Sequence, residues 1–188
     1  MNWMVRILSA TLLIMLLIGL PSYVYAEERQ KATVALIFVN NARTTYDDEL
    51  TARTMEKLHK KVDGIYNVVG GDAYLEIFSK AGITNPATAE RQELISAVRL
   101  AGDKVDYLLV SELQPFNRKE KITVFTYGKD MIATFALKIN DVVNEKYLYN
   151  GKFIVKASDS TTDWLIGNKS DAFMALDSTL IQVGEVIS

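Results

Sequence analysis

The chain has 188 residues, enough for one domain, and its 21 basic and 23 acidic side chains give a net charge of −2. This balance excludes the strongly basic surface that binds nucleic acid or an anionic membrane. The chain has no cysteine, which excludes disulfides, thiol catalysis and thiolate metal sites.

The amino-terminal segment has the layout of a secretory signal peptide. A positive charge at Arg6 precedes the uncharged apolar run Ile7–Leu20, and the small-residue end Val24-Tyr25-Ala26 comes before two glutamates. The run is shorter than the roughly 20 apolar residues that cross a membrane. We therefore predict a signal peptide over residues 1–26 and a single mature domain over residues 27–188. The alternative is an uncleaved anchor, which would be the protein's only contact with a membrane.

The mature chain begins with a strand pattern and a helix pattern. Thr33–Val39 is an unbroken apolar run rich in β-branched residues, which predicts a strand covered on both faces. Tyr46–Val62 has an apolar stripe at helical spacing, with Thr45 as the expected cap and acidic residues in the first turn. Asp63-Gly64 ends this helix, and residues 65–69 predict a second, short strand.

Two more helices lead to the most apolar strand of the chain. Gly70-Gly71-Asp72 begins a short helix that extends to Lys80. Asn85-Pro86 marks the start of the next helix, because proline suits the first helical position, and Gly102 fits the position after its end. Val105–Leu113 then predicts a buried central strand, parallel to its neighbours because crossover connections are right-handed.

From Gln114 the pattern changes to alternation of apolar and polar residues. Residues 114–121 predict a polar turn, and residues 122–127 and 131–143 predict two strands joined by a hairpin turn at Gly128-Lys129-Asp130. Alternation is typical of strands with one solvated face, so this half of the sheet is expected to be antiparallel.

The chain closes with one more strand and a helix. Tyr147–Ala157 predicts a strand that is bulged or broken at Asn150-Gly151, and Ser170 is the expected cap of a helix whose apolar stripe reaches Ile187. The predicted fold is therefore α/β (α+β). It has a mixed sheet of about five strands, with a parallel first half and an antiparallel hairpin second half, and with helices packed on it, including one at the carboxy terminus.

Four segments in this order resemble a bacterial envelope superfamily. They are TVALIFVNNA, YNVVGGDAYLEIF, LAGDKVDYLLVSEL and FALKINDVVNEKYLYNGKF. The superfamily includes the curli-secretion protein CsgG, the outer-membrane lipoprotein activators of penicillin-binding proteins, and the amino-terminal domain of TolB. The resemblance implies this fold and an envelope setting. The chain departs from the family pattern because it has no lipobox cysteine, no propeller repeat and no apolar membrane-inserting hairpin.

The polar residues do not predict a catalytic, cofactor-binding or metal-binding site. His59 is the only histidine, and we interpret it as a solvated or half-buried residue of the first helix. Asp47, Asp48 and Glu49 lack the alternate spacing of a calcium loop, so capping of the helix explains them better. Gly70-Gly71 could present N–H groups to an anion, but without a following lysine we interpret it as a tight turn.

Tyr147 and Tyr149 are the candidate partner surface. Their spacing predicts that they lie on one face of a strand, near Lys146 and Lys152. Aromatic side chains of a strand usually pack the sheet, but an exposed pair can anchor a binding partner.

We therefore expect an exported, non-enzymatic protein of the periplasm, cell surface or extracellular space. Its expected role is to bind an envelope protein or to assist assembly, with no nucleic acid partner and no cofactor. A small-ligand or glycan-binding module is the alternative, and a hydrolase ranks last. The sequence does not predict an oligomeric state.

Overall fold

The protein is described from a computed structural model, in which residues 31–187 are placed except for residues 103, 123–126 and 162–167. Lys31–Ser188 forms one compact unit. The predicted signal peptide, and the alternative of an anchor, lie outside the described residues. Among the residues that are described, no helix is long and apolar enough to cross a membrane.

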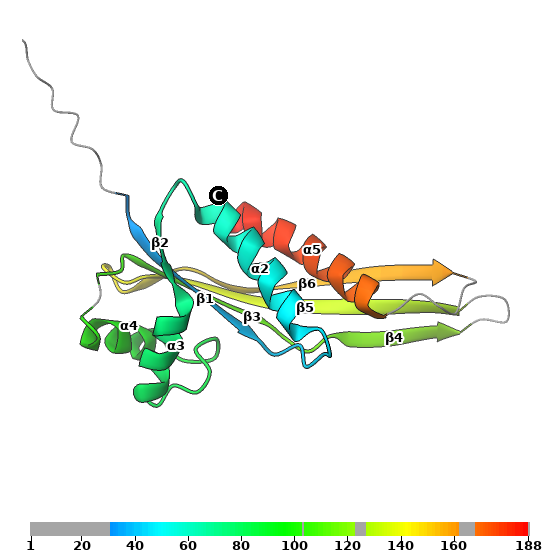
Figure 1. The fold of residues 1–188 in the computed structure, drawn as a ribbon, viewed down its shortest axis with the longest axis horizontal. Helices are drawn as coiled ribbons and strands as arrows, with labels where there is room; N and C mark the ends of the chain where they lie inside the picture. Colours follow the sequence, from blue (N-terminus) through cyan, green and yellow to red (C-terminus); the bar gives the residue numbers. More distant parts are fainter. Residues whose placement is uncertain (1–30, 103, 123–126, 162–167, 188) are drawn as a thin grey trace, which may run out of the picture. The chain divides into compact units, whose positions relative to one another are not determined.

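One mixed sheet forms the centre of this unit (Figure 1). Its strands are β1 (Thr33–Asn40), β2 (Asn67–Gly70), β3 (Tyr107–Leu113), β4 (Asn117–Ile122), β5 (Tyr127–Asp141) and β6 (Lys146–Thr161). β2, β1 and β3 are parallel, and β3, β4 and β6 each pair antiparallel with β5. The predicted fold class is confirmed, with six strands instead of about five.

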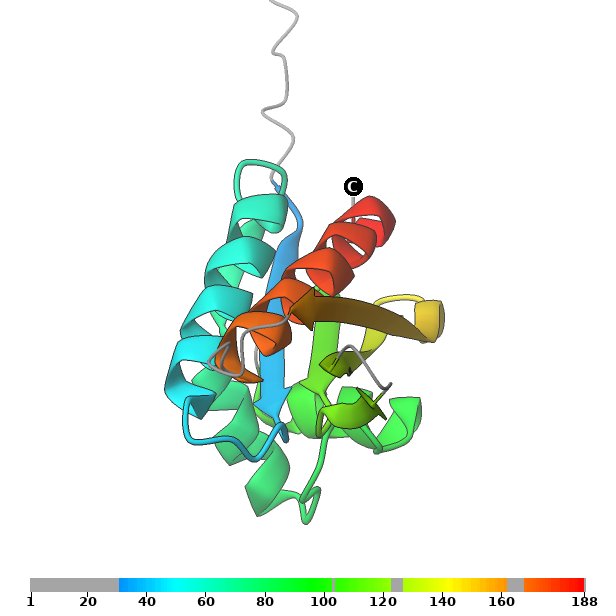
Figure 2. The same cartoon turned by 90° about the vertical axis from the view of Figure 1, so that its right-hand side faces the viewer.

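Two pairs of helices pack on opposite faces of the sheet (Figures 1 and 2). The helices are α2 (Asp47–Val62), α3 (Gly71–Lys80), α4 (Arg91–Leu100) and α5 (Asn168–Ile187). α2 and α5 share one apolar cluster with Leu109 and Leu137 of the sheet. α3 and α4 share the other with Leu108 and Val110. The alternation of β3 therefore sends consecutive side chains into two separate cores.

The central position of β3 is confirmed. It lies between β1 and β5, parallel to the first and antiparallel to the second. Tyr107 is half-buried and every later residue of the strand is buried. Because both faces are covered by helices, the strand is almost continuously apolar.

The turns predicted at residues 114–121 and at Gly128-Lys129-Asp130 are wrong. β4 begins at Asn117, inside the predicted turn, and β5 runs straight through Gly128-Lys129-Asp130. These residues have turn chemistry, but here they pair with β4 on one side and β6 on the other. Pairing along the sheet therefore overrides the local preference. The connection between β4 and β5 falls at residues 123–126, outside the described part of the chain.

The predicted start of the helix at Asn85-Pro86 is also wrong, because α4 begins at Arg91. The Asn85 side chain accepts a hydrogen bond from Ala87 N at 2.9 Å, which makes a local turn. The helix starts after Glu90, whose N–H donates to the Glu93 carboxylate at 2.8 Å. This reciprocal capping box satisfies the first turn better than the proline can.

The remaining boundaries differ by a few residues. β2 starts at Asn67, β6 starts one residue before Tyr147, and α5 starts two residues before Ser170. The expected cap at Thr45 is not made; instead the Thr44 hydroxyl donates to the Asp47 carboxylate at 2.7 Å.

Candidate partner-binding surface

One part of the sheet is covered by helices on only one face. α2 and α5 lie over one face, whereas α3 and α4 cover the other face only at one end of the sheet, near β1, β3 and the adjoining ends of β5 and β6 (Figure 1). β4, β5 and β6 extend beyond α3 and α4, so their side chains on that face have no helix above them. We call this region the open face. Its members are Ile132 and Thr134 of β5 and Lys152, Ile154 and Lys156 of β6.

The open face combines an exposed apolar side chain with lysines. Ile154 is 68% exposed, between Lys152 and Lys156, which are exposed too. Lys156 Nζ lies 2.8 Å from the carboxylate of the buried Asp130. Lys152 has no carboxylate partner among the described residues. Among the described residues of this region, the two lysines outnumber the one buried acid, Asp130. The open face therefore has a net positive charge.

The structure separates the two tyrosines of the predicted surface. The pairing of β5 with β6 shifts register between Ile139 and Asn140. Tyr149 lies on the α2 and α5 side, where it stacks on Phe153 with ring centroids 5.7 Å apart. Tyr147 lies on the other side, where the guanidinium of Arg91 in α4 is 5.3 Å from its ring centroid. The expectation that they share one face is wrong. Leu148, between them, is bulged and has no partner residue in β5, so the two tyrosines point to opposite faces.

Both tyrosines pack against the protein. Tyr149 also lines an apolar cavity of about 140 Å³, together with Tyr66, Tyr107 and Val186. Neither ring therefore projects freely from the sheet. Their role as a partner surface stays a prediction.

A buried carboxylate network ties the loop before α4 to the sheet, and the sequence analysis missed it. Glu112 is only 5% exposed. Its carboxylate accepts hydrogen bonds from Asn41 at 2.5 Å, Asn85 at 3.1 Å and Gln114 at 3.3 Å. Every donor is an amide of the protein itself, so the network is structural. A glutamate inside a mostly apolar strand is the signal that points to it.

Lys138 marks where the covered part of this face ends. Its ammonium donates to the Ala89 carbonyl at 2.9 Å, in the loop before α4. Burial lowers the pKa of Lys138, while Glu90 and Glu112 act in the opposite direction. Farther along β5 on the same face, Ala136 is still buried, and the open-face residues Thr134 and Ile132 are half-buried.

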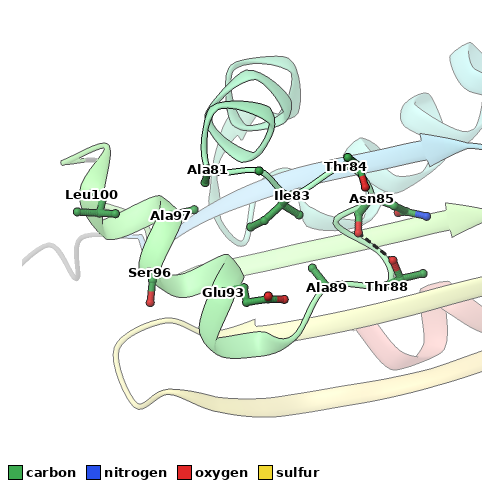
Figure 3. Close-up of a pocket in the computed structure, with 11 residues that line it drawn as sticks. Ala81, Ile83, Thr84, Asn85, Thr88, Ala89, Glu93, Ser96, Ala97 and Leu100 are labelled. Atoms are coloured by element: carbon green, nitrogen blue, oxygen red, sulfur yellow. Dashed lines mark hydrogen bonds between the residues drawn. The ribbon is translucent and has the colours of Figure 1, made fainter.

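A pocket of about 420 Å³ lies between the end of α3 and α4 (Figure 3). Its wall includes Ile83 and Ala97 with the polar side chains of Asn85, Thr88 and Glu93. The figure shows the Thr88 hydroxyl bonded to the Asn85 carbonyl, so part of this wall is fixed by the loop's own hydrogen bonds.

The other polar residues singled out in the sequence lie apart from the open face. His59 is exposed on α2, as interpreted. Asp47, Asp48 and Glu49 form the first turn of the same helix. Among the described residues, no three acidic or histidine side chains are grouped to hold a metal ion.

Gly70-Gly71 is not a tight turn. Gly70 has an extended backbone and the chain passes directly from β2 into α3. Gly71 is buried, and a Cβ on it would lie 2.1 Å from the Leu36 carbonyl oxygen. The glycine therefore allows α3 to contact β1 closely.

No protein-family model and no curated protein matches the chain. Solved structures do. A putative neuraminyllactose-binding hemagglutinin homolog from Helicobacter pylori is 12% identical, with a TM-score of 0.52 over 85% of this chain and 87% of that one. Lipoprotein GNA1162 from Neisseria meningitidis is 16% identical, with a TM-score of 0.45 over 82% and 99%. The LpoB C-terminal domain from Escherichia coli is 15% identical, with a TM-score of 0.36 over 66% and 82%.

These likenesses concern the fold, because all three identities are low. The chain therefore shares its fold with the Helicobacter pylori structure, for which the TM-score exceeds 0.5.

Proposed function

We propose that this protein is an exported, non-enzymatic component of the bacterial cell envelope that binds another envelope protein through the open face. The observation that carries the proposal is the exposed Ile154 between two lysines on a part of the sheet without helices above it. An apolar side chain within a polar rim is the usual composition of a protein-binding site.

Two further observations support this function. The signal-like segment over residues 1–26 and the lipoprotein neighbours both favour an envelope setting. The buried Glu112 is occupied by structural hydrogen bonds, and the exposed His59 lies on α2. Neither residue is placed as a general base needs to be.

Capture from envelope extract tests the proposal, with two matched isoleucine variants. Ile154 on the open face is 68% exposed, and Ile181 on α5 is 64% exposed. We expect Ile154→Asp to lose a partner that the unchanged protein captures, because the charge replaces the apolar contact. We expect Ile181→Asp to retain it. Equal capture by both variants, or repeated capture of no protein, would contradict the proposal.

The second candidate is a small-ligand or glycan-binding module, and the pocket of about 420 Å³ favours it. A ligand held there would raise the melting temperature of the protein by mass action. A thermal-shift screen of sugars in which a hit is abolished by Ser96→Trp, a substitution in the pocket wall, would favour this candidate.

A further inference from the structure

The outer edge of β6 is an unpaired strand edge. β6 has 16 residues, and β5 pairs with it along one side. Within the described residues, no strand pairs with its other side. Such an edge presents a row of N–H and C=O groups that another strand can bind.

Backbone hydrogen bonds show which residues present those groups. Gln114 N donates to the Thr134 carbonyl, so the N–H and C=O groups of Thr134 are directed away from β6. Phe135, the next residue, points toward β6 and pairs with Phe153. Lys152 and Ile154 flank Phe153 in the sequence. Their N–H and C=O groups are therefore directed to the free edge. The same alternation applies to Lys156.

These same residues place their side chains on the open face. A strand added to the edge would have one residue directly opposite each of Lys152, Ile154 and Lys156, with its side chain on the same face. An acidic residue suits each lysine, and an apolar residue suits the 68% exposed Ile154. The edge thus favours the alternating pattern acidic, any, apolar, any, acidic.

We propose that an extended segment of the envelope partner, with this pattern, adds antiparallel to the outer edge of β6. The inference rests on the proposed function and specifies how the partner binds. The main-chain hydrogen bonds of the edge hold the segment, and the lysines select its charge.

The lysines also disfavour pairing of β6 with a second copy of itself. A two-fold axis through Ile154 would set one copy's Lys152 opposite the other copy's Lys156. Like charges directly opposite each other on a sheet are destabilising. The lysines of this edge therefore disfavour the pairing of two copies. A strand with acidic residues opposite the lysines would pair without this repulsion.

The test uses peptides and the isotope-labelled protein, purified from cells that express residues 1–188. The probe is acetyl-TTETVTETT-amide, and its charge-reversed control of the same length is acetyl-TTKTVTKTT-amide. We expect the acidic peptide to shift the NMR signals of the Lys152, Ile154 and Lys156 amides and to bind about tenfold more tightly than the lysine peptide. N-methylation of its central valine should abolish binding, because it removes a main-chain donor.

Charge-reversal variants of the protein complete the test. Lys152→Glu should remove the preference between the two peptides, because each peptide would then face one like and one opposite charge, whereas Lys60→Glu, at an exposed position of α2, should leave it unchanged. Failure of the acidic peptide to shift the β6 amides would overturn the inference. Equal binding of the N-methylated peptide, or a preference unaffected by Lys152→Glu, would do so as well.

Two outcomes separate this inference from the proposed function. Concentration-dependent shifts of the same amides without peptide would show pairing of two copies and overturn the acidic partner. If the peptides fail while Ile154→Asp still loses its partner in the capture experiment, then strand addition is wrong and the proposed function stands.

Discussion

At the scale of single residues, a missing side chain positions α3 on the sheet. Gly71 is the first residue of α3, and its backbone lies close to the Leu36 carbonyl of β1. Gly70, one residue earlier, has open space around it and a φ of −65° that any residue adopts. The two adjacent glycines therefore have different roles, although the sequence presents them as one motif.

We predict that Gly71→Ala destabilises the protein by about 1–3 kcal/mol, because the added methyl group would overlap a backbone oxygen that cannot move freely. Urea unfolding measures the change. Gly70→Ala is the matched control and should change the free energy of unfolding by no more than about 0.5 kcal/mol. Equal destabilisation by the two variants would show that the close contact with Leu36 does not limit the packing of α3.

The pair Tyr147 and Tyr149 shows what the sequence could not predict at this scale. Alternate spacing places two side chains on one face only if the strand is regular. A shift of one residue in the pairing register reverses the face of everything beyond it. The shift depends on how β5 and β6 pair, at Ile139 and Asn140, and no local pattern in β6 records it.

At the scale of elements, the sequence predicts those whose pattern agrees with their surroundings. The run in Val105–Leu113 is mostly apolar because both faces of β3 are covered. Its composition therefore correctly predicts a buried strand. The hairpin signal at Gly128-Lys129-Asp130 fails because β4 and β6 flank β5 there. Pairing between distant segments supplies hydrogen bonds that a local turn would otherwise make.

The contact between α2 and α5 is likewise absent from either helix pattern alone. Arg53 and Lys57 of α2 both reach Asp177 of α5, at 2.5 Å and 2.8 Å. The hydrogen bond from Arg53, with help from Lys57 and against the effect of burial, holds the pKa of Asp177 below its ordinary value of 3.8. The ion pairs therefore stabilise the folded state when Asp177 is ionised.

We predict that Asp177→Asn lowers the free energy of unfolding at neutral pH by about 0.5–1 kcal/mol, the range of partly exposed ion pairs. Because the pKa is lowered by folding, this stabilisation is present above pH 3.8 and is lost as the pH falls through the lower pKa of the folded state. Unfolding curves of both proteins across that range test this. Glu185→Gln, an exposed change on the same helix, is the control. A difference that persists unchanged at the lowest pH would contradict the electrostatic origin.

At the scale of the whole molecule, the helices divide the sheet into covered and uncovered parts. One helix pair spans the face above β1, β3, β5 and β6, and the other ends near Lys138. The sequence predicts both helix pairs, but it does not predict how far each one extends over the sheet. Because α3 and α4 do not extend over the far part of the sheet, the open face has no helix above it. Ile154, Lys152 and Lys156 are exposed for this reason.

Amide hydrogen exchange at single-residue resolution, with and without the captured envelope partner, tests the central claim most directly. In the free protein, the amides of Lys152 and Ile154 should exchange quickly, and that of Phe153, which faces β5, should exchange slowly. Binding of the partner should slow exchange at Lys152, Ile154 and Lys156. Protection that instead appears around the pocket at Asn85, with β6 unchanged, would contradict the account.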